Sequence, residues 1–374
     1  MITRYLPLCW ILALMPAAAL RADDPIKIGE YASLTGKEAA YGETSHKGIV
    51  LAVEELNARG GVLGKKIELL TEDNQSKQGE SATVVKKLMS RDKVVALLGE
   101  VASIRSLEAA PVIQNAKIPM VSSASVNSKV TEAGDYIFRV CFVESFQGVV
   151  LAKFVNESLH VHRVAILTSV NNSYSVGMTK VFKERFLADG GVIVAEQKYS
   201  EGDKAFRAQL TAIKAAGADA IFASGYYTEA ALICRQARQL GLAKPVFGGD
   251  GWDAPALLEI GGPAMEGTYF STHYSPDNPS AEVQNFNKRY HARWSATPDA
   301  WAALAYDSAL VLIDAIKRAG STDAKAIRDA LAATKDFPAV TGHIPMDAHR
   351  NPSKAAVILT IKDGKYKFVQ SVAP

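Results

Sequence analysis

Residues 218–240, ADAIFASGYYTEAALICRQARQL, contain the change of pattern that is typical of a strand leading into a helix. The run from Ala218 to Ala223 is mostly apolar, as in a strand covered on both faces. The run from Glu229 to Leu240 repeats apolar residues at helical spacing. Between the two runs stand a glycine and two tyrosines, Tyr226 and Tyr227. A turn needs the glycine but not two large aromatic rings, so the tyrosines are candidates for contact with a ligand.

The same alternation of strand and helix is repeated along most of the chain. A first series of strand-like runs is IKIGEYASL (26–34), KKIELLTED (65–73), VVALLGE (94–100) and IPMVSSAS (118–125). A second series is RVAILTSV (163–170), VIVAEQKYS (192–200), AIFASGYY (220–227) and PVFGGD (245–250). Strands separated by helices predict parallel sheets with helices on both faces. Because 374 residues are too many for one ordinary core, the two series predict two doubly wound α/β domains.

The pattern changes near residue 300. The segment AWAALAYDSALVLIDAIKRAG (300–320) predicts a long helix, and a shorter helix follows around 327–332. The segments VTGHIPMD (340–347) and AAVILTIKDGKYKFVQ (355–370) predict antiparallel strands, with a turn at 362–364. No low-complexity linker separates the two halves, so either the domains abut rigidly or several short crossings join them.

The first 22 residues have the pattern of a secretory signal peptide. Arg4 precedes an apolar stretch from Leu6 to Ala19, and cleavage is expected after Ala22. A membrane anchor is less favoured because the stretch is shorter than the roughly 20 residues that a bilayer needs. A lipoprotein signal at Cys9 is less favoured because the bulky Leu8 precedes it. The mature protein is therefore expected to be soluble and periplasmic.

Composition limits the class of partner. The chain is 48% hydrophobic and 22% charged, which is typical of a folded soluble protein. Its net charge is +3 with both signs mixed and no long basic run, so nucleic acid is not an expected partner. The two cysteines that remain after cleavage, Cys141 and Cys234, lie in strand-like and helical runs. Buried free thiols are favoured over a disulfide.

Ligands of open parallel sheets bind beyond the carboxyl ends of the strands. The residues expected at those ends are 33–41, 73–74, 100–103, 122–125, 169–174, 226–227 and 250–252. They are rich in serine and tyrosine, include an acid beside glycines, and contain neither histidine nor cysteine. Such groups suit holding a small polar ligand. Trp252 is expected to pack rather than bind, and Glu100 is as compatible with a surface or hinge position as with the pocket.

Motifs of catalysis are missing from the sequence. No G-x-S-x-G elbow, P-loop or H-E-x-x-H pair occurs, and no G-x-G-x-x-G follows the first strand. No cofactor or metal site is therefore expected. An enzyme on a similar scaffold is the less favoured alternative to a binding protein.

Several stretches together resemble a known family. ELNARGGVLGKKIELLTED (55–73), LLGEVAS (97–103), IPMVSSAS, GYYTEA, RQARQLGL (235–242) and GGDG (248–251) are similar to the leucine/isoleucine/valine-binding family of ABC transporter solute-binding proteins. The resemblance covers essentially the whole mature chain. It implies a type I periplasmic-binding protein, with two Rossmann-like lobes joined by three hinge crossings near 141–145, 272–277 and 351–356. Lobe 1 would comprise 23–143 and 275–353, and lobe 2 would comprise 144–274 and 354–374.

The resemblance also implies a set of ligand-binding residues. They are Ser103 for the ligand carboxylate, the segment Ala124, Ser125 and Val126 for carboxylate and ammonium, Asp250 for the ammonium, and the aromatic contacts Tyr41, Tyr174 and Tyr226. Val126 stands where the family commonly has threonine. Tyr227 is expected to point away from Tyr226 and to pack, because side chains alternate along a strand. Asp250 has a structural alternative, which is to cap the helix that begins near Ala254.

The implied function is that of an extracytoplasmic, monomeric solute-binding protein that delivers an amino acid to an ABC permease in the inner membrane. A branched-chain or other hydrophobic amino acid is the favoured solute. The alternative is a solute without an α-amino group, such as an aromatic acid, an amide or a urea-like compound. Val126 favours this alternative, whereas Asp250 favours the amino acid.

Overall fold

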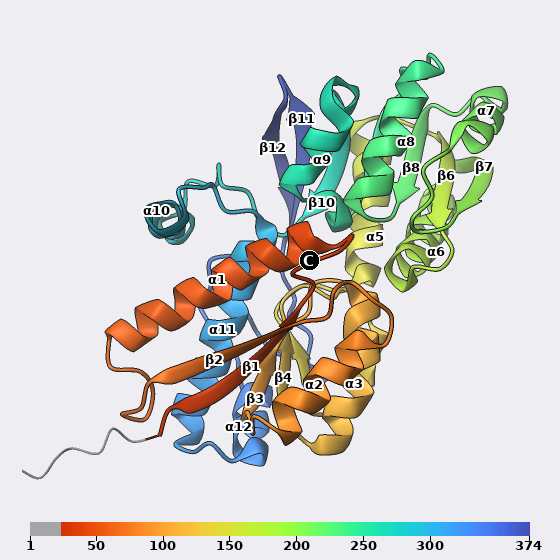
Figure 1. Cartoon of the computed structure of the whole chain (residues 1–374). Helices are drawn as coiled ribbons and strands as arrows, with labels where there is room; N and C mark the ends of the chain where they lie inside the picture. The colour runs from red at the N-terminus through yellow and green to blue at the C-terminus, as the bar shows by residue number, and fades with distance from the viewer. Residues whose placement is uncertain (1–23) are drawn as a thin grey trace, which may run out of the picture.

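The computed structural model describes residues 24–374, and the predicted signal peptide lies outside these residues. Two α/β lobes, each built around its own sheet, meet end to end (Figure 1). Within residues 24–374, no helix combines the length and apolar character needed to span a membrane. The prediction of two doubly wound lobes is confirmed.

Lobe 1 contains a five-stranded, all-parallel sheet with the order β2-β1-β3-β4-β5. Its strands are β1 Ile26–Ala32, β2 Ile67–Asp73, β3 Ala96–Leu98, β4 Met120–Ser122 and β5 Ile137–Arg139. Every residue of β3, β4 and β5 is buried. Helices therefore cover both faces of this sheet, which explains the continuous apolar runs of the sequence.

Two long helices, α1 (Ala39–Ala58) and α11 (Ala300–Ala319), lie along each other on one face of this sheet (Figure 1). Their backbones meet at Gly48, where a Cβ atom would lie 2.1 Å from the Ala302 carbonyl oxygen. Only glycine permits this approach. The other helices of the lobe are α2 (Glu80–Ser90) and α3 (Ser103–Ala116) on the opposite face, α4 (Lys129–Glu132), α10 (Ala281–Trp294) and α12 (Ala324–Ala332).

Lobe 2 contains a seven-stranded sheet with the order β12-β11-β10-β9-β8-β6-β7. The parallel strands are β6 Arg163–Ser169, β7 Val192–Tyr199, β8 Ala220–Ser224, β9 Val246–Gly248 and β10 Tyr269–Thr272. The strands β11 (Ala356–Lys362) and β12 (Lys365–Val372) form an antiparallel hairpin added to β10. Its turn uses Asp363 and Gly364 at positive φ, as the sequence predicted.

One strand prediction is wrong. The segment 340–347 forms only isolated bridges, between Phe337 and Ile344 and between Met346 and Pro352. The backbone N–H groups of Val340 and Thr341 instead donate to the buried carboxylate of Asp307, at 2.8 and 2.9 Å. A buried carboxylate thus accepts hydrogen bonds from the N–H groups that would otherwise pair with a neighbouring strand. The local sequence pattern does not predict this contact.

Helices cover both faces of the lobe 2 sheet as well. On one face lie α5 (Glu144–Lys153), which continues as the π-helical turn η1 (Phe154–Ser158), and α6 (Ser173–Ala188). On the other lie α7 (Arg207–Ala216), α8 (Tyr227–Gln239) and α9 (Pro255–Gly261), with the short turns η2 (Asp250–Trp252) and η3 (Gly262–Met265).

The chain passes between the lobes three times, namely between β5 and α5, between β10 and α10, and between α12 and β11. The exact lobe boundaries at 143, 274 and 353 stay a prediction.

Cys141 and Cys234 are both buried and free, which confirms the preference for thiols over a disulfide. Burial raises the pKa of the Cys141 thiol to about 11 and that of Cys234 to about 12, so neither is a reactive thiolate.

Candidate binding site

A small cavity of about 10 Å³, lined by buried residues, lies between the lobes, beyond the carboxyl ends of the strands. The residues that line it are Tyr41, Val101, Ala102, Ser103, Ala124, Val126, Tyr174, Tyr226, Asp250, Gly251 and Trp301. All the predicted ligand-binding residues except Ser125 are among them.

Ser125 supports the wall of the cavity from behind. Its hydroxyl lies 2.9 Å from the Glu100 carbonyl oxygen and 2.7 Å from the Ser106 hydroxyl. Its carbonyl oxygen accepts a hydrogen bond from the guanidinium of Arg139, which is fully buried. The side chain is therefore engaged inside lobe 1, and a ligand contact from this residue stays a prediction.

Aromatic rings form most of one wall. The Tyr41 ring, near the start of α1, meets the rings of Tyr226 and Trp301 edge to face, with centroids 5.5 and 5.3 Å apart. Tyr174 on α6 stacks on Tyr226 with centroids 5.5 Å apart and planes at 20°. Such a wall offers apolar contact together with negative ring faces that attract a cation.

Tyr227 does not line the cavity, which agrees with the expectation that it packs, but both tyrosines face the first lobe, contrary to the expectation that Tyr227 points away. Tyr227 lies edge to face with Tyr41 at 5.1 Å, and its hydroxyl donates to the Lys37 carbonyl oxygen at 2.7 Å. Strand alternation does not apply because β8 ends at Ser224, and Tyr226 is already the N-cap of α8. Tyr227 thus connects the two lobes beside the cavity.

Several other polar contacts hold the lobes together in a closed arrangement. The Tyr41 hydroxyl donates to the Gly251 carbonyl oxygen across the cleft, while the Gly251 N–H donates to the Tyr174 hydroxyl at 3.2 Å. The Asn127 side chain donates to the Ser173 carbonyl oxygen at 3.1 Å. At the rim, Lys37 and Glu201 form an ion pair across the lobes at 2.6 Å. The structure is therefore the closed conformation, in which the cavity is largely sealed from solvent.

The end of the cavity formed by lobe 1 is suited to an anion. Ser103 is the first residue of α3, and the preceding Ala102 provides no side-chain cap for the helix. Free N–H groups and the helix dipole favour negative charge at such an end. The Ser103 hydroxyl accepts from the Asn127 N–H at 3.2 Å, which leaves its own hydrogen available to a ligand.

Asp250 provides negative charge on the opposite lobe. Its carboxylate is only 2% exposed, and its Oδ2 atom lies 2.9 Å from Nε2 of His273, while Oδ1 has no protein partner. The N-cap of α9 is Ala254, and no side chain caps that helix. The capping alternative for Asp250 therefore lacks its hydrogen bond, and one carboxylate oxygen is left for a ligand.

His273 and Trp301 are the site residues that the sequence analysis missed. His273 directly follows β10. It would have been a candidate if the residues after this strand had been included among the expected strand ends. Its ring stacks on Phe142 with centroids 3.7 Å apart. Trp301 lies in the first turn of α11, and its indole N–H donates to the Asp253 carbonyl oxygen. Trp301 does not follow a strand, because α10 is the element before α11. Only the packing of α11 against α1 brings Trp301 to the cavity.

Two residues near the site have structural roles. Trp252 is fully buried and its indole N–H donates to the Ala223 carbonyl oxygen at 3.2 Å, which confirms the expectation that it packs. Glu100 does not line the cavity. It accepts hydrogen bonds from Ser33 at 2.5 Å, from Asn74 at 3.0 Å and from the Ala102 N–H at 2.7 Å inside lobe 1. Glu100 therefore holds the loops that form the floor of the site.

Two α/β lobes that close over a small buried cavity at their strand ends define a two-lobed solute-binding protein. The chain belongs to the periplasmic binding protein family, whose model matches residues 25–365.

Individual relatives agree with this placement. The chain is 32% identical to the Leu/Ile/Val-binding protein BraC3 of Rhizobium johnstonii, over 88% of this chain and 89% of the relative. It is similar to the crystal structure of the leucine-binding protein LivK of Thermotoga maritima, with a TM-score of 0.90, 39% identity and coverage of 93% and 99% of the two chains. It is also similar to LivJ of Streptococcus pneumoniae in complex with isoleucine, with a TM-score of 0.90, 36% identity and coverage of 94% and 100%.

Relatives with other ligands share the fold. A solute-binding protein of an ABC transporter from Rhodopseudomonas palustris, solved with 3,4-dihydroxybenzoic acid, is 27% identical with a TM-score of 0.83 and coverage of 93% and 96%. Family membership therefore defines a binder of a small solute, and the residues of the cavity must decide which solute.

Proposed function

We propose that this protein is the extracytoplasmic solute-binding component of an ABC importer, and that it binds a hydrophobic α-amino acid of the branched-chain type between its lobes. The single observation that carries the choice of solute is Asp250, a buried carboxylate that lines the cavity with one oxygen free of protein partners. LivK, a leucine-binding protein, and LivJ, solved in complex with isoleucine, support the same class.

The charges of the cavity favour a zwitterion. A buried carboxylate needs a cation or hydrogen-bond donors nearby, and no lysine or arginine is among the residues that line the described cavity. A ligand ammonium would supply the missing positive charge at Asp250. A ligand carboxylate would complement the N-terminus of α3 at Ser103, on the facing lobe. A solute that carries both groups would connect the lobes and thereby favour closure.

The remaining walls favour an apolar side chain. Ala124 and Val126 of lobe 1 and the tyrosine rings of both lobes present carbon rather than charge to the cavity. Val126 lacks the hydroxyl that a threonine would offer to the ammonium. In our proposal the unpartnered hydroxyl of Tyr226 takes over part of that task.

A second candidate solute is an aromatic carboxylic acid. Val126 and the wall of Tyr41, Tyr174 and Tyr226 favour it, and the Rhodopseudomonas relative was solved with such a compound. Asp250 opposes it, because an aromatic carboxylate has no cation to offer a buried acid. We therefore place the aromatic acid second.

Delivery to a permease follows from closure in this proposal. The closed arrangement brings together rim residues of both lobes, such as Lys37 and Glu201, on one surface that does not exist when the lobes separate. A permease that recognises this surface would accept only the loaded protein. The predicted signal peptide places the protein outside the cytoplasm, where it would meet the permease.

A thermal-shift screen tests the proposal. The mature protein is heated with each of the twenty amino acids and with benzoate, 4-hydroxybenzoate and 3,4-dihydroxybenzoate. Leucine, isoleucine and valine are expected to raise the melting temperature most, because a ligand at 100 times its Kd stabilises by about 2.7 kcal/mol. Stabilisation by an aromatic acid without stabilisation by any amino acid would overturn the choice of solute while leaving the solute-binding role in place.

A further inference from the structure

We infer that His273 sets the charge of solute that the cavity accepts: while neutral it leaves the full negative charge on Asp250 for a ligand ammonium, and once protonated it cancels that charge. The inference rests on the proposed function, because it explains how the same cavity chooses between a zwitterion and an anion. It assigns His273 as a specificity-determining residue that acts through Asp250.

The geometry of the imidazole fixes its role. Its Nε2 atom lies 2.9 Å from Oδ2 of Asp250, its Nδ1 atom has no partner, and its side chain is 1% exposed. The ring is held flat against Phe142. One nitrogen is thus held by a carboxylate, and the other has no hydrogen-bond partner among the protein groups around it.

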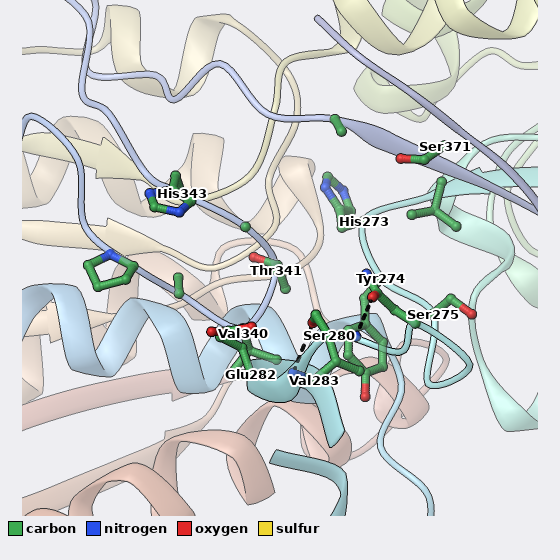
Figure 2. A pocket seen from close by; sticks show the side chains of 16 residues that line it. His273, Tyr274, Ser275, Ser280, Glu282, Val283, Val340, Thr341, His343 and Ser371 are labelled. Atoms are coloured by element: carbon green, nitrogen blue, oxygen red, sulfur yellow. Dashed lines mark hydrogen bonds between the residues drawn. The ribbon is translucent and has the colours of Figure 1, made fainter. Parts of the chain in front are cut away.

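His273 lies between two cavities. On one side it contacts Asp250, which lines the solute cavity, and on the other it lines a larger pocket between the hinge crossings, with a volume of about 330 Å³. Figure 2 shows His273 in the wall of this hinge pocket. His343, Glu282 and the loop that carries Thr341 line other parts of the same pocket. The histidine is therefore placed to transmit a change of protonation to Asp250 without contacting the solute.

The neutral ring fits these surroundings better than the charged one. A neutral ring with its proton on Nε2 donates to Asp250 and buries only the lone pair of Nδ1. A protonated ring would bury an Nδ1–H donor with no acceptor, which is the costlier arrangement. Burial correspondingly lowers the pKa of His273, although the hydrogen bond to Asp250 opposes this shift.

Other ionisable groups around the pair act on it from several elements. Lys354, which is buried before β11, disfavours a second positive charge on His273, and burial lowers the pKa of Lys354 itself to about 8. The remaining neighbours are Asp253, Cys141 and Tyr174 around Asp250, and Glu282 and His343 in the hinge pocket. None of them forms a hydrogen bond with the imidazole in the structure, so Asp250 is its direct partner.

The sign of the pH effect follows from linkage. A ligand ammonium at Asp250 repels a proton on His273, so binding a zwitterion favours the neutral ring and releases a proton wherever the empty protein holds one. Affinity for an amino acid is therefore constant above the pKa of His273 and falls below it, by at most roughly tenfold for each pH unit. Affinity for an anionic solute changes in the opposite direction.

The test compares leucine affinities of three proteins by calorimetry between pH 5 and pH 8. The proteins are the parent, His273→Gln and His343→Gln. Glutamine can donate a hydrogen bond to Asp250 but cannot become charged. His343 lines the same hinge pocket without contacting Asp250, and pairs instead with exposed Asp336 at 2.6 Å, so its variant is the matched control for loss of one histidine.

We expect the parent and His343→Gln to lose at least roughly threefold and at most about 25-fold in affinity between pH 7 and pH 5, because the pKa of His273 is lowered from its ordinary value, and His273→Gln to lose less than threefold. Parallel pH profiles of the parent and His273→Gln would overturn the inference, even if leucine binds well. Failure of every amino acid to bind would instead reject the proposed solute. In that case the inference requires that benzoate affinity rises on acidification in the parent but not in His273→Gln, and parallel profiles would again refute it.

Proton release gives a second readout that needs no variant. Leucine is titrated into the parent at pH 5.5 in two buffers of different ionisation enthalpy, and the difference in binding heat reports the protons exchanged. We expect leucine binding to release a fraction of a proton per protein molecule at pH 5.5 and to release none at pH 8. No release at pH 5.5, or proton uptake, would contradict the role of His273.

Discussion

Replacing Asp250 by asparagine tests the ammonium site most sharply, because the change removes a charge and almost nothing else. The side chain keeps its shape, and its carbonyl oxygen still accepts a hydrogen bond from Nε2 of neutral His273, which lies 2.9 Å from Oδ2 in the structure. The oxygen that has no protein partner becomes part of a neutral amide, which no longer balances a positive charge.

The expected loss of affinity is large because the site is closed. Asp250 is 2% exposed, so an ammonium bound beside it would be almost fully removed from water. Breaking a buried ion pair by removing one partner costs about 3–5 kcal/mol. At about 1.4 kcal/mol for each factor of ten, the Kd for leucine should rise by about two to four powers of ten. The number of protein hydrogen bonds stays the same, so the free energy of unfolding without solute should change by about 1 kcal/mol or less.

Isothermal titration calorimetry with leucine at pH 7.5 measures this loss, and thermal unfolding without solute checks the fold. The matched control is Asp277→Asn, which removes the same charge from an exposed position near the second crossing. It should bind leucine like the parent. If Asp250→Asn bound leucine with the affinity of the parent, the ammonium would not pair with Asp250 and the choice of an amino acid would lose its main support.

Three further outcomes are expected. Tyr226→Phe removes a buried hydroxyl that has no protein partner, so it should weaken leucine binding by roughly two- to tenfold without lowering the melting temperature of the empty protein; unchanged affinity would exclude a contact through this hydroxyl. The hydrogen bond from His46 to buried Glu30 raises the pKa of His46, so its stabilisation is present below the unfolded pKa of about 6.5 and is lost as the pH rises through the folded value. His46→Gln should therefore lower the melting temperature more at pH 5.5 than at pH 8.5, and equal losses would contradict this assignment. Small-angle scattering should show a smaller radius of gyration with leucine than without it, and identical profiles despite measured binding would refute closure by hinge motion.

The sequence was sufficient to predict the fold and most of the cavity. Apolar runs such as 163–170 have few alternatives to buried parallel strands, and the ends of such strands converge at one edge of a sheet. Tyr226 and Asp250 come shortly after strands, and Tyr174 lies in the first turn of the helix that follows β6, so strand order places them near one another.

Other features depend on contacts between distant parts of the chain. Tyr227 faces lobe 1 because α8 begins one residue after Tyr226, and a shift of one residue in a helix start changes the direction of a side chain. Ser125 is engaged by the carbonyl oxygen of Glu100, and residues 340–341 are engaged by Asp307, neither of which is adjacent in sequence. Local patterns cannot predict these contacts because they arise only when distant segments of lobe 1 pack together.

His273 illustrates a different limit. The residue stands at a strand end, as the rule for ligand sites requires, yet it interacts with Asp250 rather than with the cavity itself. Its importance appears only from the distance between two side chains that are 23 positions apart. A site can thus be predicted from strand ends, whereas the groups that control its charge need the structure.

The most direct test of the central claim compares leucine with two analogues that each lack one charged group. Calorimetric titrations at pH 7.5 would use leucine, 4-methylpentanoate, which has no ammonium, and 3-methylbutylamine, which has no carboxylate. If Asp250 binds the ammonium and the N-terminus of α3 binds the carboxylate, leucine should bind at least roughly a hundredfold more tightly than either analogue, because each loss leaves a buried polar group unpaired. Binding of 4-methylpentanoate with the affinity of leucine would contradict the claim that the closed cavity selects a zwitterionic amino acid.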